Sequence, residues 1–596
     1  MLSRPELHGT RGAVASTHWL ASAAGMAALD RGGNAFDAAA AAAFVIQVVE
    51  PHLNGPAGDV PILVYDAAAE RVSVICGQGP MPEAATPAEF RRRGLDAVPG
   101  SGLLAACVPG AFGAWLRLLR DHGRLRVEDV LEPAIGYAED GYPLLPKAAA
   151  MIGVLAPLFR DEWAESGRTY LRQGRAPAPG TRVRNPALAA TFRRVVAEAR
   201  AAGRDRERQA DAAVSAFYEG FVAETIDRFM AAGEYADSTG RRNGGLLTGK
   251  DMADWRPGTE EPVALDYRGL RVHKAGPWSQ GPVFLQQLAL LEGFDLAAAG
   301  FGSADHLHTV VESAKLAFAD REAWYGDPNH ADVPLAALLD RGYAERRRGL
   351  IGPEASAVLR PGSPDGREPW IPPLPDPAVP GGPDWAAQLD SGIPTVVART
   401  AAQGDTCCVS ASDRDGNMVV ATPSGGWLKS SPVVPGLGFP LGTRGQMAWL
   451  AEGHNNSLAP GKRPRTTLSP SLVLRDGRPY LAFGTPGGDQ QDQWTLHFLV
   501  NHVDFGMGPQ AAVEATAFHT DHAPASFTPH RSRPRSVVVE EGFEPGVLAE
   551  LRRRGHEVDV VTAGTLGRVC ATGVTADGGV VAAASPRGEQ AYAVAR

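Results

Sequence analysis

A threonine at the end of a proline- and glycine-rich stretch has the surroundings that a self-cutting nucleophile needs. Thr406 follows Gly404 and Asp405 and directly precedes the hydrophobic run that begins at Cys407. In an intact chain its hydroxyl can attack the carbonyl of Asp405 if the loop strains that peptide, and water then hydrolyses the resulting ester. The freed threonine carries both a nucleophile and a base, because its α-amine has an ordinary pKa of about 7.7–8.0 and lies beside the hydroxyl. Taken alone, such a threonine is more often simply the first residue of a strand.

The other patterns that suggest chemistry are weaker. The sequence has no G-x-S-x-G elbow, no H-E-x-x-H and no G-x-G-x-x-G between a strand and a helix. Residues 244–250 resemble a phosphate-binding P-loop, but Asp251 stands where a serine or threonine would bind magnesium, and its carboxylate would repel phosphate. Two histidine pairs lack a third metal ligand at a suitable spacing, so we interpret them as surface or packing residues. These pairs are His519 with His522 and His306 with His308.

Thr406 lies between two regions of different composition. Residues 353–404 are crowded with proline and glycine, which predicts an irregular, exposed connector and the place to look for a cut. Residues 407–412 and 418–422 flank an Asp-Gly-Asn turn and predict a hairpin, and the rest of the C-terminal third is also rich in strand signals. Before the connector, the spacing of apolar residues predicts helices over 13–49, 110–200 and 305–324 and short strands at 62–65 and 72–75.

The composition is that of an ordinary globular protein, with 596 residues of which 44% are hydrophobic and 21% charged. The net charge of −9 includes no clustered basic region, so no nucleic-acid partner is expected. The N-terminus has no apolar segment typical of a secretion signal, and no stretch is long and apolar enough to cross a membrane. We therefore expect a cytoplasmic protein with no membrane partner. The five cysteines form no C-x-x-C pair and are expected to be reduced and buried.

Several motifs in a fixed order resemble the γ-glutamyltransferase family of N-terminal-nucleophile (Ntn) hydrolases. Thr406 stands seven residues before the turn segment 413–417, which is the family's spacing from nucleophile to turn. The likeness extends along nearly the whole chain, through residues 13–18, 32–39, 49–52, 244–248, 316–321, 463–470 and 484–488. The resemblance favours Thr406 as a nucleophile and explains the P-loop-like segment as part of the family's fold.

The resemblance implies a four-layer αββα sandwich of the α+β class, assembled from two fragments of one precursor. The large fragment would be residues 1–405, ending in the connector, and the small fragment residues 406–596. Cleavage would fall between Asp405 and Thr406, and the two fragments would remain partners in one heterodimer. A homodimer of such heterodimers also fits the family.

The resemblance also assigns roles to residues of the small fragment. The family's oxyanion hole corresponds to the backbone N–H groups of Gly487 and Gly488, where glycine permits close approach and fixed donors stabilise charge in the transition state. Ser424 corresponds to a hydroxyl that hydrogen-bonds the nucleophile. Thr466 and Thr467 correspond to a hydroxyl pair that contacts the carboxylate of the acyl substrate. No metal or cofactor is expected, because the nucleophile, the base and the oxyanion donors all come from the chain.

The sequence departs from the family where a γ-glutamyl group would bind. Gln78 stands at the position of the arginine that binds the α-carboxylate, and a neutral amide cannot replace its charged, bidentate contact. Met447 stands near the position of the acidic residue that binds the α-amine, and residues 51–59 differ from the family's glycine-rich segment. Arg444 could bind a substrate carboxylate instead, with Arg465 as a second candidate, although a structural ion pair is equally expected for each arginine.

Three hypotheses follow for the small-molecule substrate and the reaction. The first is an amide or related acyl hydrolase whose acyl group carries a carboxylate but is not γ-glutamyl. Its substrate would be an oxamate-like amide or, in a natural-product or antibiotic pathway, a keto acid that is cleaved at a carbon–carbon bond. The second is a conventional glutathione hydrolase and γ-glutamyl transferase, against which Gln78 counts. The third is an unprocessed scaffold without catalysis, which the retention of Thr406, Ser424 and the glycine pair makes the least favoured.

Overall fold

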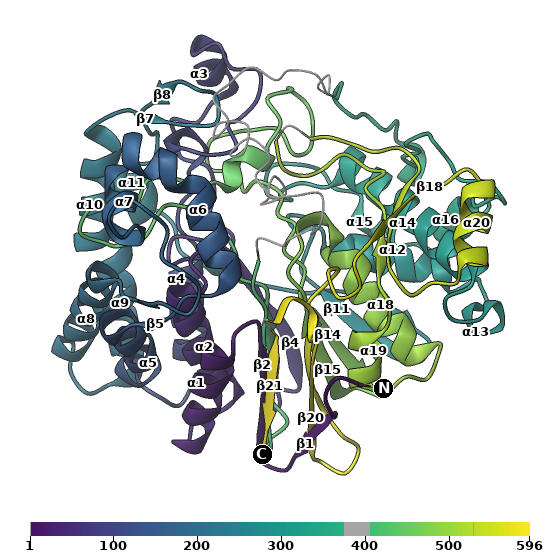
Figure 1. The fold of residues 1–596 in the computed structure, drawn as a ribbon, viewed down its shortest axis with the longest axis horizontal. Coiled ribbons are helices and arrows are strands. Elements are labelled where there is room, and N and C mark those ends of the chain that lie inside the picture. Colours follow the sequence, from purple (N-terminus) through teal and green to yellow (C-terminus); the bar gives the residue numbers. More distant parts are fainter. Residues whose placement is uncertain (1, 375–405, 529, 590) are drawn as a thin grey trace.

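Two seven-stranded antiparallel sheets lie face to face at the centre of the molecule (Figure 1). The structure is a computed structural model that describes residues 2–374, 406–528, 530–589 and 591–596. The first sheet has the order β1 (Leu7–Gly9), β20 (Val580–Ala584), β19 (Cys570–Val574), β15 (Arg478–Gly484), β14 (Ser471–Arg475), β11 (Leu270–Lys274) and β10 (Val263–Tyr267). The second has the order β21 (Tyr592–Ala595), β2 (Gly12–Ser16), β12 (Val409–Asp413), β13 (Met418–Ala421), β3 (Val60–Asp66), β4 (Arg71–Gly77) and β9 (Gly258–Glu260).

Helices cover the outer face of each sheet (Figure 1). The helices on the side of the second sheet are α1 (Trp19–Asp30), α2 (Ala35–Val49), α4 (Ala111–His122), α5 (Val127–Asp140), α6 (Pro146–Asp161), α7 (Ala164–Tyr170), α8 (Pro186–Ala201), α9 (Arg206–Tyr218) and α10 (Phe221–Ala231). The helices on the side of the first sheet are α12 (Gly281–Leu291), α14 (Ala304–Trp324), α18 (Gln491–Val503), α19 (Pro509–Glu514) and α20 (Pro545–Arg553). The expected four-layer αββα sandwich is therefore confirmed.

Side-chain alternation along the strands creates the layers. In β13, Val419 packs toward the helices of the second sheet, whereas Met418 and Val420 pack between the sheets. Neighbouring β2 behaves in the same way, with Val14 outward and Ala15 inward. Because successive side chains of a strand point to opposite faces, a continuous hydrophobic run supplies both cores at once.

Both predicted fragments contribute strands to both sheets. In the second sheet, β12 from the C-terminal part pairs with β2 from the N-terminal part, and β13 pairs with β3. In the first sheet, β14 pairs with β11, and β20 pairs with β1. A cut in the connector would leave these hydrogen bonds intact, so the fragments would stay together as one fold.

The predicted elements agree with the structure in most places. The hairpin after the connector is confirmed as β12 and β13, and the strands at 62–65 and 72–75 are parts of β3 and β4. The helix predicted from residue 13 is wrong at its start, because residues 12–16 pair with β12 and β21 as strand β2. The first helix begins only at Trp19 and is capped by His18, whose Nδ1 accepts a hydrogen bond from the Leu20 N–H.

Smaller elements complete the description. A third sheet joins β16 (Phe518–His519), β17 (Ser536–Glu540) and β18 (Glu557–Val561), and two-stranded pairs join β5 (Tyr142–Pro143) to β6 (Arg182–Val183) and β7 (Tyr235–Ala236) to β8 (Arg242–Asn243). Short helices are α3 (Pro87–Arg92), α11 (Gly249–Ala253), α13 (Leu296–Ala299), α15 (Leu335–Leu338), α16 (Arg341–Arg348), η1 (Leu103–Ala105), η2 (Pro364–Gly366), η3 (Arg444–Met447), η4 (Gly488–Gln490) and η5 (Arg587–Glu589). Across the described residues, no helix combines the length and apolar character needed to cross a membrane.

Candidate active site

Thr406 lies three residues before β12, one of the inner strands of the second sheet. Its side chain is buried, and it forms an isolated bridge with Ser424, which follows β13. The two hydroxyl oxygens are 3.5 Å apart, at the outer limit of a hydrogen bond. Strand pairing thus places Ser424 beside Thr406, as the resemblance predicts. Asp405, the predicted residue on the other side of the cut, lies outside the described residues.

Asp59 is an acidic residue that pairs directly with Ser424. Its backbone exchanges two hydrogen bonds with Ser424, at N–O distances of 2.8 and 3.0 Å. The carboxylate is buried, and burial raises its pKa while the neighbouring Arg444 opposes that rise. In the sequence Asp59 was noticeable only as a departure from a glycine-rich segment. The strand pairing makes it part of the candidate site.

Arg444 forms a buried ion pair with Asp59. Its Nη2 donates to one carboxylate oxygen at 2.8 Å, and its Nε lies 2.8 Å from the other. The guanidinium also packs near the rings of Trp427 and Phe527, 5.3 and 5.9 Å from their centroids. Its remaining nitrogen, Nη1, lies 3.7 Å from the sulfur of Met447, a weak acceptor. Arg444 was considered either for binding a substrate carboxylate or for a structural ion pair, and the structure contains the ion pair.

The predicted hydroxyl pair lies on the other side of Asp59. Thr466 Oγ1 is 3.4 Å from Asp59 Oδ2, so the same carboxylate links Arg444 to Thr466. Thr467 is also fully buried, and its Oγ1 has no hydrogen-bond partner among the described residues. A buried hydroxyl without a partner is costly, so Thr467 has a donor and acceptor available for a ligand.

Gly487 and Gly488 form a sharp turn between β15 and α18. Their φ angles are +138° and +53°, in the region that favours glycine, and a Cβ at Gly487 would lie 2.2 Å from the Trp494 ring. Neither backbone N–H has an acceptor among the described residues. Both groups stand where η4 and then α18 begin, and the start of a helix favours negative charge. The turn therefore has the properties of an oxyanion hole.

A buried polar side chain ties this glycine turn to the threonine pair. Gln280 stands directly before α12, and its backbone N–H donates to the Thr466 carbonyl at 2.9 Å. Its side-chain Nε2 reaches the carbonyls of Gly488 and Asp489 at 3.4 and 3.2 Å. Its Oε1 accepts a hydrogen bond from Arg321 at 2.9 Å. Sequence reasoning missed Gln280, because nothing local marks a glutamine that bridges two distant loops.

Four charged side chains form a network next to the glycine turn. Arg321 pairs with both Glu322 and Asp489, and Arg465 pairs with Glu322 at 2.9 Å. Burial alone would raise the pKa of Glu322, but Arg465 and Arg321 hold it below its ordinary value. Arg465 also donates to the Arg321 carbonyl at 3.0 Å. The second arginine considered for substrate binding is therefore part of a neutral internal network.

Gln78 is buried but makes only a local contact. Its Nε2 donates to the carbonyl of Gly79 at 3.1 Å, and its Oε1 has no partner among the described residues. Hydrogen bonds connect this segment to the site. The Val108 N–H donates to the Pro80 carbonyl, and the N–H groups of residues 110 and 111 donate to the carbonyl of Gly58, the neighbour of Asp59. Gln78 thus offers a neutral amide where the family's arginine would stand.

A buried acid contacts the residue that follows Thr406. Glu50 accepts hydrogen bonds from the Thr17 hydroxyl at 2.5 Å and from the Cys407 thiol at 3.3 Å. Burial raises the pKa of Glu50 and also raises that of Cys407. Cys408, one residue on, packs between the sheets instead. The two adjacent cysteines therefore pack into different cores, and all five cysteines are buried free thiols, as expected.

The motifs set aside in the sequence have structural roles. Asp251 caps α11 through a reciprocal pair of hydrogen bonds with Thr248, so the P-loop-like segment is a helix start. His308 does gain neighbours, since Glu312, four residues later in α14, and the distant His556 lie close enough to share an ion with it. Lys315, however, forms an ion pair with Glu312 at 2.6 Å, and His308 hydrogen-bonds His556 at 2.8 Å. The chain itself therefore already supplies partners to Glu312 and His308, whereas His556 Nδ1 has no partner among the described residues.

Residues 21–595 match the family described as Gamma-glutamyltranspeptidase, and the chain belongs to this family. It is accordingly an enzyme of the Ntn hydrolase class. The chain is 31% identical to the glutathione hydrolase-like YwrD proenzyme of Bacillus subtilis, over 98% of both chains. Further relatives are described as acylase and oxamate amidohydrolase proenzymes.

Solved structures give the same assignment. A structure described as LmbA2991HD is 51% identical, with a TM-score of 0.93 and complete coverage of both chains. The cephalosporin acylase from Bacillus halodurans is 30% identical, with a TM-score of 0.83 over 100% of this chain and 97% of its own. The fold and the family are thus shown independently of the site geometry.

Proposed function

We propose that this protein is made as a proenzyme that cuts itself between Asp405 and Thr406 and then hydrolyses an acyl bond through an acyl-enzyme on Thr406. Its relatives are described as proenzymes, which supports a maturation step. The buried Thr406 at the head of β12, with Ser424 beside its hydroxyl, supports this residue as the nucleophile. The heterodimer of residues 1–405 and 406–596 is the proposed active form.

The proposed reaction needs only groups of the chain. The new α-amine of Thr406 takes the hydroxyl proton while the oxygen attacks the substrate carbonyl. The negative charge that develops on the carbonyl oxygen is stabilised by the N–H groups of Gly487 and Gly488, and one such donor typically contributes about 2.7–4 kcal/mol. Collapse breaks the scissile bond, and the departing nitrogen or carbon takes the proton from the α-ammonium. Water then attacks the ester, and the acid product leaves.

The proposed acyl group is not γ-glutamyl, and the observation that carries this conclusion is the Asp59–Arg444 ion pair. A γ-glutamyl group would need a cation for its carboxylate and an acid for its amine. Here the two charges beside Ser424 and Thr466 neutralise each other at 2.8 Å, and Gln78 adds no cation. The groups left for a ligand are the outer edge of Arg444 and the Thr467 hydroxyl, which suit one small carboxylate or carbonyl.

Two substrate classes fit this description. One is a short amide with an oxamate-like acyl group, and the other is a keto acid cleaved at a carbon–carbon bond in a natural-product pathway. In the second case the keto group is the carbonyl that Thr406 attacks, so the departing carbon needs an electron-withdrawing substituent of its own to bear the negative charge until the α-ammonium protonates it. The cephalosporin acylase likeness supports substrates other than glutathione, whereas the relatives described as glutathione hydrolases keep the conventional activity as the alternative.

Intact mass spectrometry of the wild-type protein beside Thr406→Ala tests the nucleophile. We expect the wild type to yield fragments that end at Asp405 and begin at Thr406, and the variant to remain whole and inactive. Thr406→Ser is the matched control, because it keeps a hydroxyl and should still be cut. A wild-type chain that stays whole after prolonged incubation, or a variant that is still cut, would overturn the proposal and favour the scaffold hypothesis.

A substrate screen follows for the processed enzyme. Glutathione, oxamate-like amides and short keto acids would be compared by kcat/KM at equal enzyme concentration. We expect turnover of at least one non-glutamyl substrate. The value of kcat/KM for glutathione should be lower than for that substrate by a factor of about 100 or more, which corresponds to a loss of about 2.7 kcal/mol in binding. Efficient glutathione cleavage would refute the acyl-group argument while leaving the nucleophile assignment intact.

A further inference from the structure

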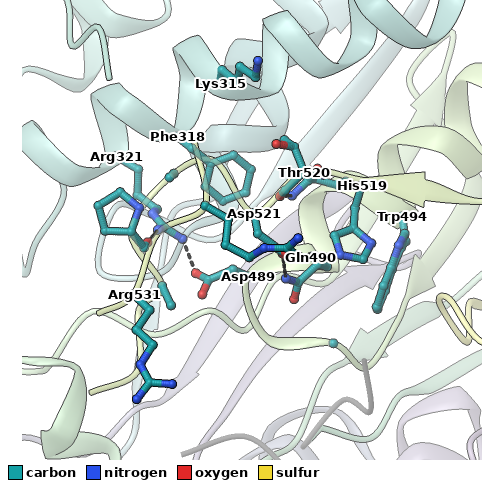
Figure 2. Close-up of a pocket in the computed structure, with 16 residues that line it drawn as sticks. Lys315, Phe318, Arg321, Asp489, Gln490, Trp494, His519, Thr520, Asp521 and Arg531 are labelled. Carbon is teal, nitrogen blue, oxygen red and sulfur yellow. Dashed lines mark hydrogen bonds and ion pairs between the residues drawn. The ribbon is translucent and has the colours of Figure 1, made fainter. Parts of the chain in front are cut away.

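A cavity of about 260 Å³ opens beside the candidate oxyanion hole (Figure 2). Gly487 lines this cavity, whereas Thr406, Ser424, Asp59, Arg444 and the threonine pair do not. Its walls come from α14, from η4 and the start of α18, and from the chain between β16 and β17. The cavity thus shares one potential oxyanion donor with the candidate active site and is otherwise built from different segments.

The walls combine aromatic rings with one cation that is not neutralised. Phe318 and Trp494 provide apolar surface, and Figure 2 shows them on two sides of the polar centre. A cavity of about 150 Å³ can hold benzene, so the space here is enough for one substituted aromatic ring.

Most charges that line the cavity are already paired. Arg321 forms an ion pair with Asp489, and Arg533 lies 3.6 Å from Asp521 and also pairs with Asp559. Lys315 is bound to Glu312.

Arg531 is the exception among the charged lining residues. It is exposed, and its guanidinium makes no ion pair or side-chain hydrogen bond with the described part of the chain. In Figure 2 it stands at the lower left edge of the group, away from the paired charges. With the other charges balanced, Arg531 leaves this cavity with an unmatched positive charge, and an anionic ligand would supply the missing partner.

We infer that this cavity binds the departing half of the substrate and that it favours a departing group with an aromatic ring and a carboxylate. This inference rests on the proposed function. A carbonyl whose oxygen faces Gly487 and Gly488 has two other substituents, and the acyl half belongs on the side of Asp59, Arg444 and Thr466. The second substituent must then extend from the carbonyl in another direction, and the cavity at Gly487 offers it aromatic walls and enough volume for one ring.

Binding can be tested without turnover. Calorimetric titration of the processed enzyme would compare 3-carboxy-4-nitroaniline with 4-nitroaniline, which has the same ring without the carboxylate. We expect the carboxylated ring to bind more tightly by about five- to tenfold, as one charge-assisted contact predicts. Arg531→Gln should abolish most of this preference, and Arg531→Lys should restore part of it. Arg204→Gln, which alters an exposed arginine on the loop between α8 and α9, is the matched control.

Kinetics separate this inference from the proposed function. The same two rings serve as leaving groups in anilides of whichever acyl group the enzyme accepts. Arg531→Gln should raise KM for the carboxylated anilide by about five- to tenfold and leave kcat and the neutral anilide unchanged. Equal binding of both rings, or a preference that survives Arg531→Gln, would overturn the inference. Binding that depends on Arg531 in an enzyme that cleaves neither anilide would support the cavity and count against the proposed reaction.

Discussion

The Asp59–Arg444 pair allows the sharpest quantitative prediction. Asp59→Asn removes the negative charge and leaves Arg444 as a buried cation without a counterion. Two unit charges about 4 Å apart interact by about 4 kcal/mol at an effective dielectric constant of 20, and removal of one partner of a buried pair typically costs about 3–5 kcal/mol. The asparagine keeps one oxygen as an acceptor, so we expect a loss of about 3 kcal/mol in the free energy of unfolding.

Thermal unfolding is the assay for this loss. With an unfolding entropy of about 2.1 cal/mol/K per residue, a chain of 596 residues that unfolds as one unit should show a fall in Tm of about 2–3 °C. The single variant Arg444→Gln and the double variant Asp59→Asn with Arg444→Gln complete a double-mutant cycle. Because the double variant has no unpaired charge, it should be more stable than the sum of the two single losses by about 2 kcal/mol.

The same cycle has a functional readout. Arg444 without its partner should bind a carboxylate more strongly, so Asp59→Asn should lower KM for carboxylate-bearing acyl substrates relative to neutral ones by about tenfold. Additive stability losses, together with unchanged substrate preference, would refute the conclusion that these two charges neutralise each other in the acyl subsite.

Two further predictions concern the glycine turn and the buried histidines. Gly487→Ala would place a Cβ 2.2 Å from the Trp494 ring at a φ of +138°, so the turn must shift. We expect kcat to fall by a factor of about 100–1,000. Gly453→Ala is the control, because Gly453 also has a positive φ but faces open space, and this variant should change kcat little. Burial lowers the pKa of His556 from 6.5 to about 3. Below pH 6.5 the unfolded chain binds a proton at His556 that the folded chain does not bind. The free energy of unfolding should therefore decrease as the pH is lowered, by about 2 kcal/mol at pH 5 from this residue. His556→Gln should flatten the pH profile of Tm between pH 7.5 and 5, and an unchanged slope would show that His556 is protonated in the folded state.

The proposed catalytic elements that lie within short segments could be identified from the sequence. Thr406 could be located because composition changes sharply there, and the Pro-Gly-Gly segment marked a turn that only glycine can make. The family motifs then gave the roles of Ser424 and the threonine pair, and the structure places these residues together. Asp405, the cleavage position, the cytoplasmic location and the homodimer stay predictions.

The charge partners could not be predicted in the same way. Asp59 and Arg444 are 385 positions apart, and His308 and His556 are 248 apart. No local pattern links the two members of either pair, because they lie in distant segments of the chain. Whether Arg444 binds substrate or forms an ion pair depends on which chain segments the sheets bring together.

Hydrophobic periodicity and turn chemistry are local, and they determined the hairpin, most helices and the glycine turn, while the family motifs pointed to Thr406 as the proposed nucleophile. Strand register is not local, because it depends on pairing between segments hundreds of residues apart. It placed residues 12–16 in a strand where the sequence favoured a helix, and it set Asp59 beside Ser424. The sequence therefore determined the family and the proposed catalytic groups, and only the tertiary structure decided which charges neutralise each other within the chain.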